Sequence, residues 1–193
     1  MKHLEKGESM KHLGTGQLET ERLILRAFRK EDAPAMYRNW ASDPDVTKFL
    51  TWPTHGSEEV TAQLLACWEE KYQEENYYSW AIVPKALGEP VGSISVVEIK
   101  KNTGTAVIGY CIGKRWWHQG ITSEAFTRVI RYLFDEAGFR RIEAQHAAEN
   151  PHSGMVMKKC GLRHEGTLRG AGCNNQGFYD LCVYGILKED VKS

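Results

Sequence analysis

Hydrophobic residues form two different patterns on either side of a short turn-like stretch near the middle of the chain. From Thr105 to Ile112 nearly every residue is apolar or β-branched, which is typical of a largely buried strand. Beyond Ala125 the apolar residues recur at the spacing of one helix face, at Phe126, Val129, Ile130, Leu133 and Phe134. The stretch between the two patterns runs from Trp117 to Thr122. The sequence therefore predicts a strand, a tight turn and an amphipathic helix between residues 105 and 136.

The rest of the chain divides into similar short patterns. Strands are predicted over residues 19–28, 77–83, 91–99, 142–147, 163–169 and 178–187. Helices are predicted to begin at Asp32, as a side-chain N-cap, at Ser57, and at Asn150, where the cap is followed by proline. Residues 43–56 and 170–177 are expected to be loops. The order β-α-α-β-β-β-α-β-α-β-β predicts a mixed α/β (α+β) fold, with helices on both faces of one sheet.

The chain is expected to fold as one domain. With 193 residues it can bury about 70% of its unfolded surface, and residues 17–193 are expected to form a single unit. Before them, the letters MKHL occur at Met1 and again at Met10, around a polar, glycine-bearing spacer. The repeat indicates an alternative start or a segment added to the natural chain. We therefore expect residues 1–16 to be a disordered N-terminal extension outside the fold.

Charge and composition narrow the range of partners. The chain has 25 basic and 25 acidic residues, and a net charge of zero argues against a general binder of nucleic acid or anionic membranes. No apolar run approaches the roughly 20 residues of a membrane span, and no secretory signal is visible. The five cysteines are scattered without metal-ligand spacing, which is typical of small apolar residues in a reducing compartment. A cytoplasmic protein without a metal centre is expected.

The glycine turn has the features of an anion site. Gly120 has no Cβ, so the backbone can come close to a ligand. A helix start leaves several backbone N–H groups without partners, and the helix dipole adds partial positive charge there. Together these features suit a pyrophosphate. An ordinary strand-to-helix turn explains the same residues equally well.

Three separated pieces of the sequence resemble one enzyme family. The strand, the letters WHQGIT and the helix resemble the acyl-CoA pyrophosphate turn of the GCN5-related N-acetyltransferases (GNATs), usually written Q/R-x-x-G-x-G/A. The stretch from Asn150 to Ser153, followed by Lys158 to Leu162, is similar to the next helix of that superfamily, N-x-x-S…K-x-G-F/L. The opening LETERLILRAFRKEDA and the ending YDLCVYGILKED are similar to the subgroup of ribosomal-protein alanine N-acetyltransferases. The likeness spans residues 17 to 190 in consistent order.

The resemblance implies a mixed, mostly antiparallel, seven-stranded sheet in which two central strands splay apart. The pantetheine arm of acetyl-CoA would lie in that opening and pair with backbone at Cys111, Ile112 and Gly113. The pyrophosphate would bind in the turn after Trp117, at the amides of His118, Gln119, Gly120, Ile121 and Thr122. Asn150 and Ser153 would face the pantetheine and the thioester sulfur.

The catalytic residues of the family are only partly present. Many members place a general-acid tyrosine where this chain has Met157, and a carboxylate where it has Val107, so tyrosine-acid chemistry is not carried over. Ser153 is the best candidate to donate a hydrogen bond to the departing thiolate. A first-turn serine can instead bond its local backbone. Asn150 can act as a helix cap, as a cofactor ligand, or as both.

The sequence does not single out one residue as the general base. His146 titrates near neutrality, but a lone histidine on a strand is more often structural. Glu98, near the end of a predicted strand, and Glu149, beside Asn150, are carboxylate candidates. A chain of waters could also deprotonate the amine. Tyr110 is interpreted as a packing residue.

The sequence thus favours an acetyl-CoA-dependent N-acetyltransferase whose acceptor is a primary amine, and it favours a protein or peptide N-terminal α-amine as that acceptor. One alternative is an enzyme for a small-molecule amine such as a polyamine, an amino acid or an antibiotic. A second is a CoA-binding module without catalysis. The loops over residues 40–56 and 170–177 are expected to contact the acceptor, but their residues do not identify it. A homodimer is left open.

Overall fold

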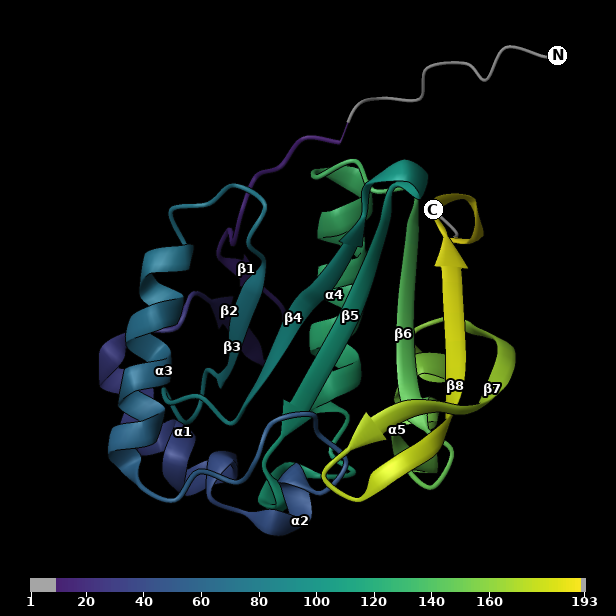
Figure 1. Ribbon diagram of the computed structural model, residues 1–193. Helices are drawn as coiled ribbons and strands as arrows, with labels where there is room; N and C mark the ends of the chain where they lie inside the picture. Colours follow the sequence, from purple (N-terminus) through teal and green to yellow (C-terminus); the bar gives the residue numbers. More distant parts are fainter. Residues whose placement is uncertain (1–9, 192–193) are drawn as a thin grey trace, which may run out of the picture.

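A computed structural model describes residues 10–191, which fold around one eight-stranded sheet (Figure 1). The strand order is β1-β2-β3-β4-β5-β6-β8-β7, and every neighbouring pair is antiparallel except β5 and β6. The strands are β1 (Leu18–Glu19), β2 (Leu23–Arg26), β3 (Ser79–Pro84), β4 (Gly92–Lys100), β5 (Thr105–Ile112), β6 (Arg141–Ala147), β7 (Arg163–Asn174) and β8 (Gly177–Leu187). The expected mixed, mostly antiparallel fold is confirmed.

The expected count of seven strands is exceeded by one short strand. The predicted strand over residues 19–28 is broken by a turn, in which the amide of Thr20 donates to the carbonyl of Leu23 at 3.0 Å. The part before the turn forms β1, which pairs Leu18 with Leu25 of β2. This extra strand lies at the sheet edge, away from β5 and β6.

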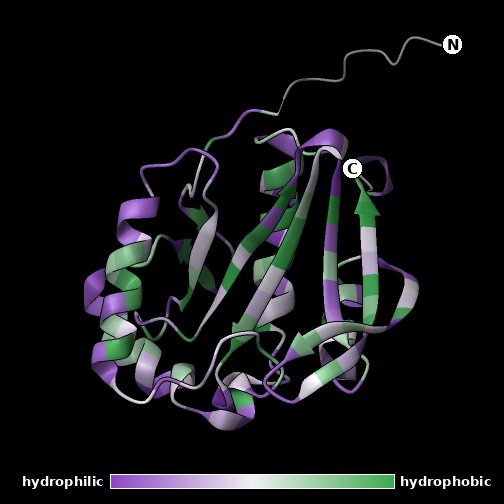
Figure 2. Cartoon of the chain, in the orientation of Figure 1, coloured by the Kyte–Doolittle hydropathy of each residue, from purple (hydrophilic) through white to green (hydrophobic). Residues whose placement is uncertain are grey.

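Helices cover the two faces of the sheet and divide the core into two clusters. The α-helices are α1 (Ala33–Met36), α2 (Pro44–Thr47), α3 (Glu58–Lys71), α4 (Ile121–Asp135) and α5 (Pro151–Lys159). The larger cluster packs α4 and α5 against one face, and the smaller one packs α1 and α3 against the other. Figure 2 shows hydrophobic residues along the central strands and hydrophilic residues on much of α3. The amphipathic helix predicted after Gly120 is thus confirmed as α4, with ten of its residues buried.

The helix starts predicted at Asp32 and Ser57 are confirmed, since these are the N-cap residues of α1 and α3, but the expected side-chain cap bonds are not formed, and one expected loop is partly helical. The side chain of Asp32 does not cap α1; it forms a two-pronged ion pair with Arg26, at 2.7 and 2.8 Å, and accepts from the amide of Arg29. Ser57 makes no side-chain cap bond at α3. The segment over residues 43–56 contains α2, whose start is capped by Asp43. A nearby arginine therefore outcompetes the helix for Asp32.

Residues 10–16 differ from the expected extension, because they lie against the fold. The indole of Trp80 donates to the carbonyl of Gly16 at 2.7 Å, and the hydroxyl of Tyr132 donates to that of Gly14 at 2.9 Å. The amide of Gly14 donates to the carbonyl of Glu75 at 2.7 Å. The remainder of the predicted extension, residues 1–9, lies outside the described residues.

The two central strands part halfway along their length. β5 pairs with β6 only from Thr105, opposite Arg141, to Ile108, opposite Ala144. Beyond that point β5 continues beside β4, while β6 continues beside β8, and the two strands diverge in Figure 1. The splayed pair implied by the resemblance is confirmed. The opening between β5 and β6 leaves strand backbone without a strand partner.

Candidate active site

The backbone of β5 supplies polar groups to the opening at alternate residues. The amide of Gly113 donates to the carbonyl of Val91 beside β4, at 2.9 Å. Because backbone groups alternate sides along a strand, Cys111 and Gly113 point toward β4, whereas Tyr110 and Ile112 point toward the opening. Of the predicted pantetheine contacts, only Ile112 therefore presents its backbone to the opening. Tyr110, which the sequence analysis did not include among these contacts, joins it there.

The turn before α4 presents a run of amide donors. His118 and Gly120 have positive φ angles of 59° and 74°, which orient the chain sharply into the helix. The amides of His118, Gln119 and Gly120 have no hydrogen-bond partner in the part of the chain that the structure describes. The next amides, of Ile121 and Thr122, belong to the first helical turn and precede the i−4 bonds of the helix. These are the amides that the sequence predicted for the pyrophosphate.

Two side chains of the turn brace its own backbone. The indole nitrogen of Trp117 donates to the carbonyl of Ile112 at 2.9 Å, and the side-chain amide of Gln119 donates to the carbonyl of Arg115 at 2.8 Å. Both side chains thus fix the shape of the loop between β5 and α4. Because these two side chains are occupied within the loop, the backbone amides are the polar groups that the turn leaves available.

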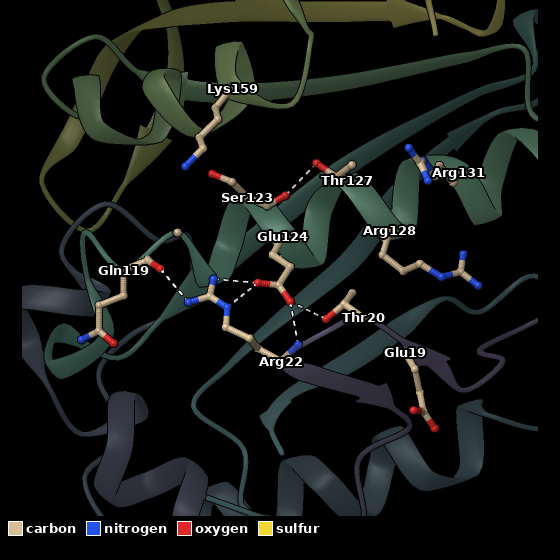
Figure 3. Close-up of a pocket in the computed structure, with 11 residues that line it drawn as sticks. Glu19, Thr20, Arg22, Gln119, Ser123, Glu124, Thr127, Arg128, Arg131 and Lys159 are labelled. Atoms are coloured by element: carbon tan, nitrogen blue, oxygen red, sulfur yellow. Dashed lines mark hydrogen bonds and ion pairs between the residues drawn. The ribbon is translucent and has the colours of Figure 1, made fainter. Parts of the chain in front are cut away.

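Cationic side chains gather around the start of α4. They line a pocket of about 560 Å³ whose lining also includes Gly120 (Figure 3). A Cβ placed on Gly120 would lie 3.6 Å from Nζ of Lys159 and 3.7 Å from Nη2 of Arg22. In Figure 3, Lys159 reaches toward the turn from α5, and Arg22 approaches from the other side. Arg128 and Arg131 line the pocket along α4. The positive charge adds to the helix dipole at the same place.

Glu124 ties the edge of the sheet to this helix start. It accepts from Nε of Arg22 at 2.6 Å and from the hydroxyl of Thr20 at 2.5 Å. Burial alone would raise the pKa of Glu124, but the hydrogen bonds from Thr20 and Arg22 outweigh it and lower the pKa. Lys159 has no acidic partner within residues 10–191, so its charge remains available to an anion.

Ser153 lies at the start of α5 and bonds a residue of β5. The hydroxyl of Tyr110 lies 3.0 Å from Oγ of Ser153 and 2.9 Å from its carbonyl oxygen. The ring of Tyr110 also packs against Phe126, with ring centroids 5.5 Å apart. Tyr110 is therefore both the packing residue that the sequence predicted and a polar partner of Ser153. The Ser153 hydroxyl is directed to this tyrosine instead of its local backbone.

Asn150 occupies the N-cap position of α5 but does not cap with its side chain. Its carbonyl accepts from the amide of Ser153 at 3.2 Å. The side-chain amide has no partner among the described residues, so it can meet a ligand. Nearby, the rings of His118 and His152 contact edge to face with centroids 5.1 Å apart. This contact places the start of α5 beside the glycine turn.

His146 lies beneath α5. Its Nδ1 bonds the carbonyl of Ala147 at 2.7 Å, and its Nε2 is buried without a partner among the described residues. A Cβ on Gly154 would lie 2.5 Å from that Nε2, so only glycine fits the helix over the ring. Burial lowers the pKa of His146. The position favours a structural role over the role of general base.

Glu98 lies on β4, and β5 separates it from the strand that carries His146. It sits beside a bulge of β4, opposite Val107, and its side chain is exposed. It makes no ion pair with any residue from 10 to 191. Glu143 is held by Lys100 at 2.9 Å and by Gln145 at 2.8 Å. Of these two carboxylates, Glu98 is the one left free to meet an amine.

No metal centre or membrane-spanning helix is found in the described part of the chain. Across residues 10–191, His, Cys, Asp and Glu form no group of three that could hold a metal ion. No helix in that range is long and apolar enough to cross a membrane.

Comparison with known proteins identifies the family. A family model for the acetyltransferase (GNAT) domain matches residues 22–163. The chain is 32% identical over 171 residues to the uncharacterized N-acetyltransferase YoaA of Bacillus subtilis, covering 89% of this chain and 96% of that protein. It is 27% identical over 166 residues to the ribosomal-protein-serine acetyltransferase of Escherichia coli, covering 86% and 92%. A GNAT-family acetyltransferase structure from Bacillus anthracis matches with a TM-score of 0.79 at 26% identity, covering 90% of this chain and 99% of that one. The chain belongs to the GNAT family and is an N-acetyltransferase.

Proposed function

We propose that this N-acetyltransferase moves the acetyl group of acetyl-CoA to a primary α-amine, and that the acceptor is the N-terminus of a protein or peptide. The observation that carries the cofactor half of the proposal is the run of amides from His118 to Thr122, which ends at the helix start beside Lys159 and Arg22. Amide donors with nearby cations suit a pyrophosphate.

The groups around the opening fit the rest of acetyl-CoA. The carbonyl of Ile112 already accepts from Trp117, so the backbone of Tyr110 and the amide of Ile112 are the groups that suit the amides of a pantetheine arm, as a strand edge suits an added strand. The free side-chain amide of Asn150 and the hydroxyl of Ser153 lie at the near end of α5. The cationic pocket along α4 suits the nucleotide phosphates. Acetyl-CoA supplies an activated thioester, and these residues bind and orient it.

Acetyl transfer to an α-amine does not need a strong general base from the protein. The acceptor nitrogen must be neutral when it attacks, and the departing sulfur must be stabilised. An α-amine has an unperturbed pKa near 8 against about 10.4 for lysine, so at pH 7 it is neutral about 250 times more often. An α-amine acceptor therefore suits a site in which His146 is enclosed and the other two candidate bases, Glu98 and Glu149, are exposed carboxylates. Ser153 would donate to the sulfur.

The acceptor would approach beside two loops that one residue joins. The side-chain amide of Asn175, in the β7–β8 turn, donates to the carbonyls of Thr47 and Trp52 at 2.9 and 2.7 Å. Its backbone amide donates to the carbonyl of Leu50 at 3.1 Å. The two segments expected to contact the acceptor thus meet as one wall, which Figure 1 shows below the splayed strands. Such a wall suits the extended end of a chain, and the similarity to a ribosomal-protein-serine acetyltransferase supports a protein acceptor.

A competition assay tests the acceptor. A peptide with a free small N-terminal residue is mixed with an N-blocked peptide that carries an internal lysine, and acetylation is followed by mass at pH 7 and pH 9. The free N-terminus is expected to win at pH 7, and its advantage to narrow at pH 9 as lysine deprotonates. Preferred acetylation of the lysine at pH 7 would defeat the proposal. Activity only on free polyamines, amino acids or antibiotics would establish the small-molecule alternative, and no turnover with any amine would leave a CoA-binding module.

A further inference from the structure

One partly buried hydroxyl has two acceptors on the same residue. Tyr110 lies in β5 where the strand leaves β6, and its hydroxyl is 2.9 Å from the carbonyl oxygen of Ser153 and 3.0 Å from Oγ. A phenol carries a single proton, so it can donate to only one of the two at a time. The direction of the Ser153 hydroxyl proton therefore depends on which of the two oxygens accepts from Tyr110.

The two arrangements differ in what Ser153 can offer a substrate. If Tyr110 donates to the carbonyl of Ser153, the serine hydroxyl donates back to the phenol oxygen, and its proton is engaged. If Tyr110 donates to Oγ, the serine proton is free to point elsewhere. The carbonyl loses nothing essential in this second arrangement, because an α-helix supplies it with the amide of Met157, four residues on.

Burial keeps Tyr110 in the form that donates. It raises the pKa of Tyr110 above the usual range, so the phenol stays protonated at any pH where the enzyme would work. The contact with Phe126 holds the ring in place. A fixed, permanently protonated donor beside Oγ is a means of orienting the serine.

We propose that Tyr110 is a positioning residue that holds the Ser153 hydroxyl with its proton directed toward the departing sulfur. The inference rests on the proposed role of Ser153. The acceptor nitrogen forms a C–N bond with the acetyl carbon, and the C–S bond breaks with its electron pair left on sulfur. Ser153 donates a hydrogen bond to that sulfur. The nitrogen loses one proton to solvent and the thiolate takes up one, so Tyr110 ends the cycle unchanged.

Tyr110→Phe removes the hydroxyl and retains the ring. We expect kcat to fall by about three- to fivefold, less than in Ser153→Ala, because the serine proton remains but loses its orientation. The KM for acetyl-CoA and the circular dichroism spectrum should stay near wild type. Tyr132→Phe is the matched control, because it too removes a buried hydroxyl that donates to a backbone carbonyl, at 2.9 Å from Gly14. Its kcat should be unchanged.

The leaving group separates orientation from a general structural effect. An acetyl-CoA analogue with oxygen in place of the thioester sulfur has a more basic leaving group, which depends more on a donor. The deficit of Tyr110→Phe should therefore widen with the oxygen ester, and adding Tyr110→Phe to Ser153→Ala should cost nothing further. Equal deficits with both esters, or a full additional loss in the double variant, would overturn the inference. Wild-type turnover in Ser153→Ala would instead defeat the proposed role of Ser153, whereas a slow Ser153→Ala beside a normal Tyr110→Phe would defeat this inference alone.

Discussion

The turn before α4 and the start of α5 lie side by side, but they present different kinds of groups. The turn offers backbone amides, and its side chains at Trp117 and Gln119 are occupied in holding the loop. The start of α5 offers side chains, with Ser153 set against Tyr110. Backbone donors tolerate many side-chain replacements, whereas a side-chain site depends on single atoms. The first region should therefore govern affinity for acetyl-CoA, and the second should govern the rate.

The largest expected effect comes from Gly120→Val. Its φ of 74° is strained for a β-branched residue, at a cost of about 1–3 kcal/mol. A side chain there would also point toward Lys159 and Arg22, where the anion is proposed to bind. Acetyl-CoA affinity by calorimetry should fall by about 100-fold or more, because each charge-assisted hydrogen bond lost is worth about 1.5–3 kcal/mol.

The control for that variant is Gly88→Val. Gly88 has a φ of 76° with open space around it, so it carries the same backbone strain away from the turn. It should lower stability while leaving affinity for acetyl-CoA unchanged. Similar affinities for folded Gly120→Val and Gly88→Val would contradict the assignment of the turn.

The next largest effect is expected at Ser153, and it is a loss of rate instead of a loss of affinity. Ser153→Ala should lower kcat by about 10- to 100-fold, since the departing sulfur loses its donor, and should leave acetyl-CoA affinity nearly unchanged. Met157→Ala, one turn further along α5, should act through packing, with a loss of about 2–5 kcal/mol in the free energy of unfolding and little effect on kcat in the folded protein. If Ser153→Ala turned over at the wild-type rate, the serine would be structural.

A smaller effect is expected at Lys159. Lys159→Gln should weaken acetyl-CoA binding by about three- to tenfold at low salt, and the difference from wild type should shrink as salt screens the charge. The neighbouring Lys158 is exposed and does not line the pocket, so Lys158→Gln is a charge-matched control. Equal losses in the two variants would show that only net charge matters.

The smallest effect concerns the framework of the turn. Glu124 has a lowered pKa in the folded protein, so its contribution to stability is complete above its unfolded pKa of about 4.3 and is lost as the pH falls through the folded value. Glu124→Gln should therefore melt at a lower temperature than wild type at pH 6–7, and the gap should close below about pH 4. Thermal melts across this range measure it, and a gap that does not vary with pH would exclude the carboxylate's charge as the cause.

Features that depend on neighbouring residues could be predicted from the sequence, whereas features that depend on tertiary contacts could not. The strand, turn and helix of residues 105–136 are local patterns, and β5 and α4 confirm them. Asp32 was expected to cap a helix, because the capping pattern does not show how the chain turns between Arg26 and Asp32, which brings the guanidinium within reach of the carboxylate. The packing of residues 10–16 depends on contacts with residues such as Glu75, distant in the chain. The local sequence therefore predicts the secondary structure of these segments, whereas the residues that they contact depend on the tertiary structure.

The residues of the candidate site also differ in whether the sequence alone could identify them. Gly120 and Ser153 lie in recognisable motifs, so both could be singled out from the sequence. Tyr110 could not, because it lies 43 positions from Ser153 and looks like one more apolar residue of a buried strand. Its hydroxyl acquires a role only when the fold brings the start of α5 within reach of β5. The enclosure of His146 by Gly154 is equally invisible in a linear sequence.

The most direct test of the backbone-built turn is an NMR titration of the amide protons of residues 118–122 with acetyl-CoA. We expect downfield shifts concentrated at these amides, because they would donate to a phosphate. ADP, which retains a pyrophosphate, should reproduce the shifts, and S-acetylpantetheine, which lacks one, should not. Equal shifts at these amides with S-acetylpantetheine, or none with acetyl-CoA at saturation, would contradict the account.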